Sequence, residues 1–107
     1  MPKFLIQASY TVEGLRALKR DKALTRMSAV KDAVLSVGGK LEGMYWALGD
    51  DEAVLILDLP DEETAAALSM HVGAVGLVRT KTKRLLNVKD IETALGKAID
   101  YESPDDS

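Results

Sequence analysis

The sequence contains no cysteine and a single histidine, His71, among its 107 residues. Disulfides, cysteine-ligated zinc sites, thiol nucleophiles and histidine clusters for a metal are therefore excluded. No apolar run is long enough to span a bilayer, and the chain begins with a strand-like segment rather than the apolar core of a signal peptide. These absences predict a cytoplasmic protein without a membrane span or a metal site.

A basic excess is also missing, because 14 Lys and Arg residues stand against 17 Asp and Glu residues. The resulting net charge of -3 argues against a general nucleic-acid-binding protein. The length suits one domain with one modest core. We expect that domain to cover residues 1–99, followed by a disordered acidic tail over residues 100–107, where apolar periodicity is lacking.

Apolar periodicity predicts the order of helices and strands. Residues 3–10 alternate between apolar and mixed positions, as a half-buried strand does. A slip in helical spacing near Asp21 predicts two helical segments between Thr11 and Gly38-Gly39, with Asp21 capping the second. The same patterns predict strands over residues 40–48, 52–59 and 76–86, and helices over residues 62–75 and 88–99 that are capped by Asp61 and Asn87.

The predicted order, β-α-β-β-α-β with an extra C-terminal helix, is that of an α+β, ferredoxin-like sandwich. The strands over residues 3–10 and 52–59 are expected in the centre of the sheet. The acids Asp50, Asp51 and Glu52 would then lie at a hairpin tip, where Gly and Asp serve the turn itself. We favour this turn interpretation over an acid/base pair or a metal site, and expect replacement of Asp50 and Asp51 to leave stability unchanged.

Three segments, KFLIQASYTVEGL, GGKLEGMYWALGDDEAVLILDLPD and AAALSMHVGAVGLVRTKTKRLL, together resemble the GYD-domain family over about residues 3–90. The family is named for a Gly-Tyr-Asp signature. This chain departs from it there, since Gly49 is followed by Asp51 and Glu52, which keeps an acid and loses the aromatic residue. The resemblance implies a dimeric α/β-barrel type of protein, whose relatives include small monooxygenases, isomerases and ligand-sensing domains.

Helices can cover only one face of such a sheet. We assign to them Phe4, Ile6, Ala8, Leu55, Leu57 and Leu59, together with Leu41, Gly43, Tyr45 and Ala47 of the second strand. The opposite, open face would then carry an apolar patch that is too large to leave in water. We expect a second copy to cover it, which makes the protein a homodimer or a higher homo-oligomer. The side chains predicted on the open face are Leu5, Gln7, Ser9, Glu42, Met44, Trp46, Leu48, Val54, Ile56, Asp58, Arg79, Lys81 and Lys83.

The polar residues of the open face, with Trp46, form the candidate ligand site. Trp46 would be its apolar wall, and the guanidinium of Arg79 could hold a carboxylate with two hydrogen bonds. The ligand would be a small, partly apolar molecule with a negative or strongly accepting group. Alternatively, the cations of the last strand protect a sheet edge, or Arg79 pairs with Glu42 or Asp58. The predicted ligand-binding residues are Gln7, Ser9, Trp46, Asp58, Arg79 and Lys81.

Three functions follow. The first is a small cytoplasmic homo-oligomer that binds a small molecule between open sheet faces. The second is a cofactor-independent enzyme, monooxygenase- or isomerase-like, that works with Gln7, Ser9, Trp46, Asp58 and Arg79. The third is an interaction module without a pocket. No cofactor, nucleic acid or membrane is implied, no catalytic residue is assigned, and His71 is interpreted as a partly buried structural residue.

Overall fold

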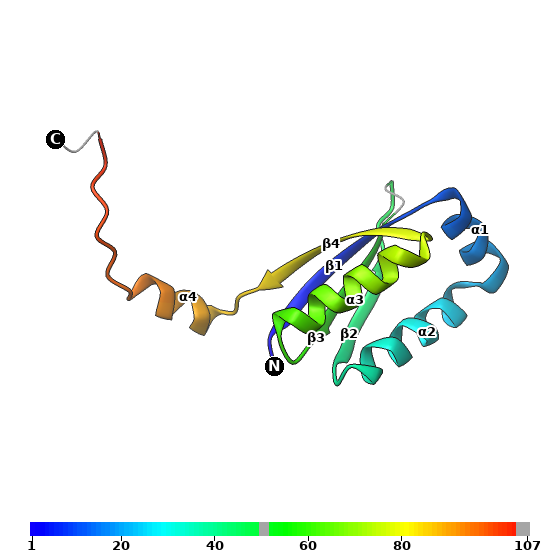
Figure 1. Ribbon diagram of the computed structural model, residues 1–107, viewed down its shortest axis with the longest axis horizontal. Coiled ribbons are helices and arrows are strands. Elements are labelled where there is room, and N and C mark those ends of the chain that lie inside the picture. The colour runs from blue at the N-terminus through cyan, green and yellow to red at the C-terminus, as the bar shows by residue number, and fades with distance from the viewer. Residues whose placement is uncertain (50–51, 105–107) are drawn as a thin grey trace.

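The computed structural model describes residues 1–49 and 52–104 (Figure 1). In chain order its elements are β1 (Lys3–Tyr10), α1 (Val12–Asp21), α2 (Ala23–Ser36), β2 (Lys40–Trp46), β3 (Glu52–Asp58), α3 (Glu62–Val75), β4 (Val78–Leu85) and α4 (Val88–Leu95). The strands form one antiparallel sheet in the order β2-β3-β1-β4. The predicted α+β class is confirmed, β1 and β3 are central as expected, and the arrangement is compatible with a ferredoxin-like fold.

The core lies between the sheet and the helices α1, α2 and α3. Alternation along β1 and β3 turns every second side chain toward these helices, so Leu57 and, just after β3, Leu59 are 0% exposed. Val34 from α2 and Ala65 from α3 close the core from the other side. The predicted helix-covered residues of both central strands are confirmed as buried: Phe4, Ile6, Ala8, Leu55, Leu57 and Leu59.

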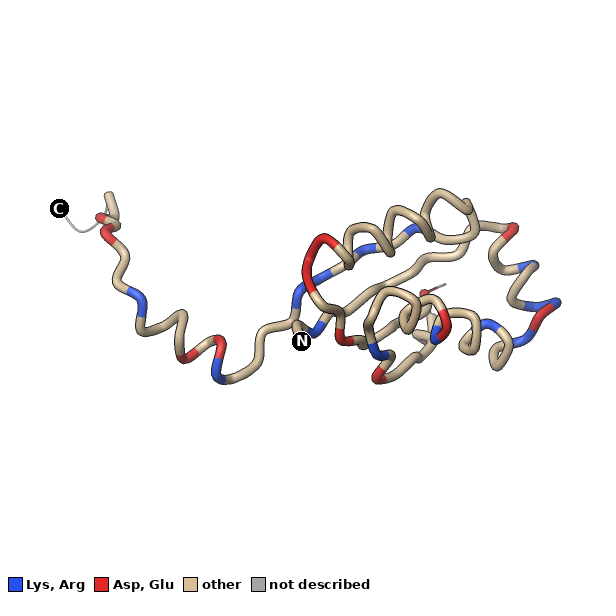
Figure 2. The backbone as a smooth tube through the Cα atoms, turned by 60° about the horizontal axis from the view of Figure 1, so that its bottom comes forward, with Lys and Arg blue, Asp and Glu red and all other residues tan. Residues whose placement is uncertain are grey.

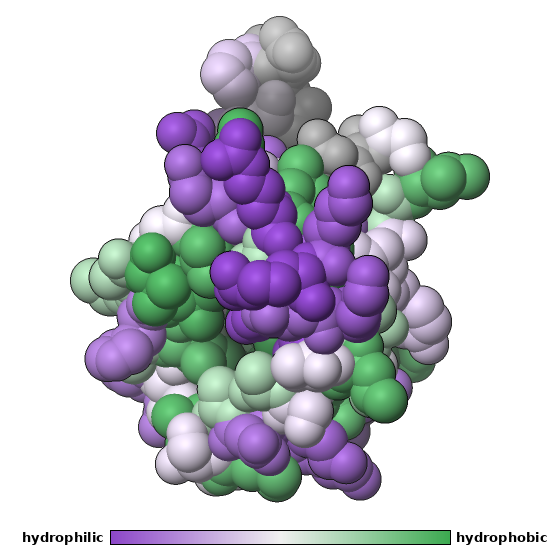
Figure 3. Space-filling model, turned by 90° about the vertical axis from the view of Figure 1, so that its right-hand side faces the viewer, coloured by the Kyte–Doolittle hydropathy of each residue, from purple (hydrophilic) through white to green (hydrophobic). Residues whose placement is uncertain are grey.

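The predicted break near Asp21 is confirmed, but Asp21 does not cap α2. Lys22 occupies the cap position with φ 75°, a left-handed conformation that is uncommon for a residue with a side chain. The Asp21 carboxylate instead accepts a 2.9 Å hydrogen bond from Arg20 and lies 3.5 Å from Arg26. The bond from Arg20 holds the pKa of Asp21 below its usual value. Hydrophilic side chains gather over the end of the molecule where α1 and α2 meet (Figure 3).

An irregularity in β2 changes which of its residues face the helices. Leu41 pairs with Leu57 as alternation requires, but the next residue to pair is Gly43, opposite Ile56. Glu42 is therefore an extra residue, and such a bulge reverses the faces of everything beyond it. Trp46 now pairs with the buried Ala53 and shares the helix face with Met44, while Gly43 and Tyr45 share the open face. The predicted faces of these four residues are wrong for this reason.

The second half of the chain departs from prediction in smaller ways. His71 is exposed on α3 rather than partly buried, and Val75 at the end of the same helix is also exposed. Asn87 caps α4 through a capping box with Asp90, as predicted for the cap. The helix ends at Leu95 rather than at residue 99, and it projects away from the sheet (Figure 1).

Two predictions fall on residues outside the described ranges. Asp50 and Asp51 lie outside the described residues, so the turn interpretation of these acids stays a prediction. On either side of them, Ala47 N donates a 3.0 Å hydrogen bond to Glu52 O. Of the predicted acidic tail, residues 100–104 carry no helix or strand and residues 105–107 lie outside the description.

Two helical glycines give opposite predictions for substitution by alanine. A Cβ on Gly14 of α1 would lie 1.9 Å from the backbone oxygen of Leu77, whereas a Cβ on Gly73 of α3 would meet nothing within 4 Å. Gly14→Ala should therefore destabilise the fold by about 1–3 kcal/mol, as overpacking does. Gly73→Ala should stabilise it by about 0.5–1 kcal/mol through helix propensity. Urea denaturation measures both, and equal effects would contradict the close approach of α1 to Leu77.

Candidate functional site

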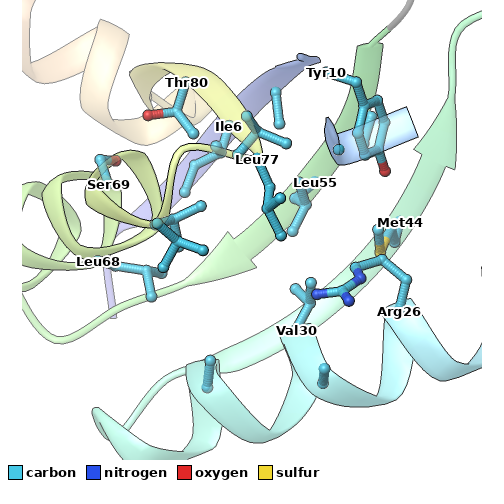
Figure 4. Close-up of a pocket in the computed structure, with 18 of the residues that line it drawn as sticks. Ile6, Tyr10, Arg26, Val30, Met44, Leu55, Leu68, Ser69, Leu77 and Thr80 are labelled. Atoms are coloured by element: carbon cyan, nitrogen blue, oxygen red, sulfur yellow. The ribbon is translucent and has the colours of Figure 1, made fainter. Parts of the chain in front are cut away.

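The structure contains an apolar cavity of about 220 Å³ on the helix-covered side of the sheet, between α2 and α3 (Figure 4). Ile6 and Leu55 form its floor, Val30 lines it from α2, and Leu68 lines it from α3. Leu77, which precedes β4, points into the space from above in this view. The walls are therefore mostly aliphatic side chains, which favour an apolar occupant.

Four polar side chains also line this cavity: Tyr10, Arg26, Ser69 and Thr80. In Figure 4 the guanidinium of Arg26 extends from α2 into the space, on the side opposite Ser69 and Thr80. Within the described part of the chain, its contact with Asp21 at 3.5 Å is at the limit of a hydrogen bond. Most of the five N–H donors of this guanidinium are thus available to an accepting group in the cavity.

Trp46 lies beside the cavity rather than on the open face. Its Nε1 donates a 3.0 Å hydrogen bond to Oη of Tyr10, a residue of the cavity wall, and Trp46 as a whole is 37% exposed. Because Tyr10 accepts this bond, its own O–H can still donate to a second acceptor. The prediction that Trp46 forms a wall of an open-face site is wrong, because the bulge at Glu42 turns it to the other side of the sheet.

The other five predicted ligand-binding residues do share the open face. Ser9 pairs across the sheet with Glu52 on one side and Arg79 on the other, and Gln7 pairs with Lys81. The hydroxyl of Ser9 donates a 3.0 Å bond to Glu52. The residues that the structure brings to this face are Gln7, Ser9, Asp58, Arg79 and Lys81.

Lys3 organises the carboxylates at one end of the open face. Its ammonium donates to Glu42 and, at 3.1 Å, to Asp58, and these hydrogen bonds, led by the one to Glu42, raise the pKa of Lys3. The alternative in which Arg79 pairs with Glu42 or Asp58 is therefore wrong. Among the described residues, no carboxylate lies within ion-pairing distance of Arg79, Lys81 or Lys83.

Sequence reasoning missed Lys3 and the polar residues of the cavity. The antiparallel register places Lys3 opposite Asp58, which the strand assignments could have shown. Arg26 lies four residues before Val30 and seven before Ala33, a spacing that puts all three on one side of a helix. That side of α2 faces the cavity, so helical periodicity was the available signal for Arg26.

Residues 1–49 and 52–104 contain neither a membrane-spanning helix nor a cluster of metal ligands. Across these ranges no helix combines the length and apolar character needed to cross a membrane. In the same ranges no three His, Asp or Glu side chains gather closely enough to hold a metal ion.

Comparison with known proteins identifies the family. The GYD domain matches residues 4–95, from the second residue of β1 to the last residue of α4. No match is found among curated proteins or among solved structures. The resemblance carried by the three sequence segments is thus confirmed over most of the chain, and the protein belongs to the GYD domain family.

Proposed function

We propose that this protein binds a small, partly apolar molecule with a carboxylate or a similar accepting group, held in the cavity between α2 and α3. The observation that carries the proposal is the guanidinium of Arg26, which extends into an otherwise largely aliphatic cavity. Ligand sites in proteins commonly combine an apolar lining with a few polar groups that fix orientation.

The dimensions of the cavity favour a small ligand. Its volume of about 220 Å³ is below the range of roughly 300–1,000 Å³ that is typical of sites for drug-sized molecules. Aliphatic side chains from the sheet, α2 and α3 would surround the apolar part of the ligand. A single-ring acid or a short-chain aliphatic acid has suitable size and chemistry.

The polar groups would orient such a ligand at one end of the cavity. The side chain of Arg26 is 31% exposed, so its attraction for a carboxylate is less weakened by water than at a fully exposed position. A guanidinium can also hold both carboxylate oxygens at once. Tyr10 adds a hydroxyl donor, and together these residues supply orientation and charge rather than an acid–base pair, which favours binding over catalysis.

We further propose that the chain is a homo-oligomer that assembles through its open sheet face. Leu5, Val54 and Ile56 of the two central strands remain only partly buried there, and Tyr45 of β2 is 62% exposed. A contiguous apolar surface of this kind is commonly an interface. This is the arrangement expected of a dimeric α/β-barrel type.

The open face also provides a second candidate for the ligand site. Arg79 and Lys81 are exposed, and neither has a carboxylate partner among the described residues. An anionic ligand enclosed between two open faces would pair with them, alongside Gln7 and Ser9. This candidate requires assembly, whereas the cavity lies within one chain.

Two arginines distinguish the candidate sites. We expect some small aliphatic or aromatic acids to raise the melting temperature of the wild type, by the linkage of binding to stability. Arg26→Ala should abolish this shift and Arg79→Ala should retain it. Arg20→Ala is the matched control, because it removes another partner of Asp21 without altering the cavity wall. The opposite pattern would place the ligand on the open face, and no shift in the wild type would refute both sites.

Filling the cavity gives an independent test. Ala33 lines it from α2, whereas Ala66 is exposed on α3 and is not part of the wall. Ala33→Leu should abolish the thermal shift produced by an acid, because the added carbons occupy the space of the ligand, while Ala66→Leu should leave the shift unchanged. Retention of the fold is checked by circular dichroism. An unchanged shift in a folded Ala33→Leu variant would exclude the cavity as the binding site.

A further inference from the structure

The helix α4 presents an apolar side to solvent. Val88 is 79% exposed, Ile91 43% and Leu95 75%, and their spacings of three and four residues place them on one side of the helix. Ile99, also exposed, follows four residues later. Figure 1 shows that α4 and residues 96–104 extend away from the sheet and the other helices. We name residues 87–104 the C-terminal arm.

The arm requires a partner surface for physical reasons. α4 contains eight residues, whereas isolated helices shorter than about 12–15 residues are marginal in water. The capping box of Asn87 and Asp90 satisfies backbone groups at the start of the helix, but it buries none of the apolar side. Packing of Val88, Ile91 and Leu95 against another surface would supply the missing stabilisation.

Charge indicates which surface this is. The arm contains four acids and two bases, whereas residues 1–86 contain 11 acids and 12 bases, so the acidic excess of the chain lies at its C-terminal end. Figure 2 marks these charges along the backbone. On the open face Arg79, Lys81 and Lys83 are exposed cations without a carboxylate partner among the described residues. They lie next to the apolar side chains of the central strands.

We infer that the C-terminal arm of each copy docks on the open sheet face of a second copy of this chain. Ile91 and Leu95 would cover the apolar side chains Leu5, Val54 and Ile56, and the acids of the arm would lie near the cations of β4. The inference rests on the proposed assembly through the open face and specifies which segment covers it.

The direction of the arm favours the second copy over its own chain. The backbone at Asn87 is extended, with φ -85° and ψ 179°, so the arm continues outward from the end of β4. The molecule consequently measures 61 Å along its longest axis and 31 and 24 Å along the others. To reach its own open face the arm would have to reverse direction after Leu85. In a two-fold pair, each arm instead covers the open face of the partner. The same contact therefore forms twice, and it buries the apolar side of both arms and the apolar side chains of both open faces.

Full-length variants of the arm test the inference by sedimentation at micromolar concentration. The wild type should sediment at twice the 11.6 kDa of one chain. Ile91→Asp combined with Leu95→Asp should weaken association by about a hundredfold or more, because carboxylates would replace the apolar side chains that cover Leu5, Val54 and Ile56. Thr93→Asp is the matched control, since it adds an acid on the opposite side of the same helix and should leave the dimer intact. The added acids increase attraction to the β4 cations, so lost attraction cannot explain dissociation.

Engineered cysteines then distinguish the second copy from the same chain, without background because the natural sequence has none. A mixture of Leu95→Cys and Val54→Cys chains should form a mixed disulfide dimer on oxidation, and a mixture of Thr93→Cys and Val54→Cys should form much less. A double variant, Leu95→Cys with Val54→Cys, that cross-links within one chain would overturn the inference.

The outcomes separate the arm from the open face. If the arm variant remains a dimer while Ile56→Lys dissociates it, the arm inference fails and assembly through the open face stands. If the wild type is a monomer, both are wrong. The ligand-binding proposal is tested separately by the thermal shifts of the Arg26 and Ala33 variants.

Discussion

The two central strands, β1 and β3, bury one side chain in two, and the rest of the structure depends on this alternation. Phe4 and Leu57 turn toward the helices, while their neighbours Leu5 and Ile56 turn the other way. Three helices cover the first side, so the second remains available for contacts outside the chain. The cavity and the cations Arg79, Lys81 and Lys83 of β4 consequently lie on opposite faces of the sheet.

The cavity has its origin in small residues on the covered face. Ala8 and Ala53 lie at its sheet side, Ala29 and Ala33 on α2, and Gly14 on α1. Larger side chains at these positions would fill the space between α2 and α3, as core packing normally does. The close approach of Gly14 to the backbone of Leu77 also fixes α1 against the end of α3, so α1 cannot move inward to close the cavity. The cavity therefore results from small side chains on the covered face, not from incomplete coverage of the sheet by helices.

Apolar periodicity was sufficient to predict the order of elements and the break near Asp21, because these depend on local sequence. The rule for right-handed crossovers then gave the fold class and the central strands. The faces of β2 were not predictable in this way, because they depend on the bulge at Glu42. The sequence around Glu42 offers little beyond Gly43 to indicate that bulge. Trp46 was therefore assigned to the wrong side. The cavity depends on the separation of α2 from α3, which is a tertiary property, although helical spacing could have shown that Arg26 and Val30 point the same way.

The separation of the two faces also bears on how ligand binding and assembly relate. Arg26 lies on the helix side of the sheet and Arg79 on the open side, so a ligand in the cavity would not touch a partner on the open face. Coupling between them requires that the ligand bind the monomer and the oligomer with different affinity. The residues able to transmit such a difference are neighbours in β1, where Ile6 lines the cavity and Leu5 faces the proposed interface. Hydrogen-bonded strands hold β1 on both sides. A ligand that does not move β1 would therefore leave assembly unchanged. The architecture thus favours independence between the proposed ligand binding within each chain and the proposed association between chains.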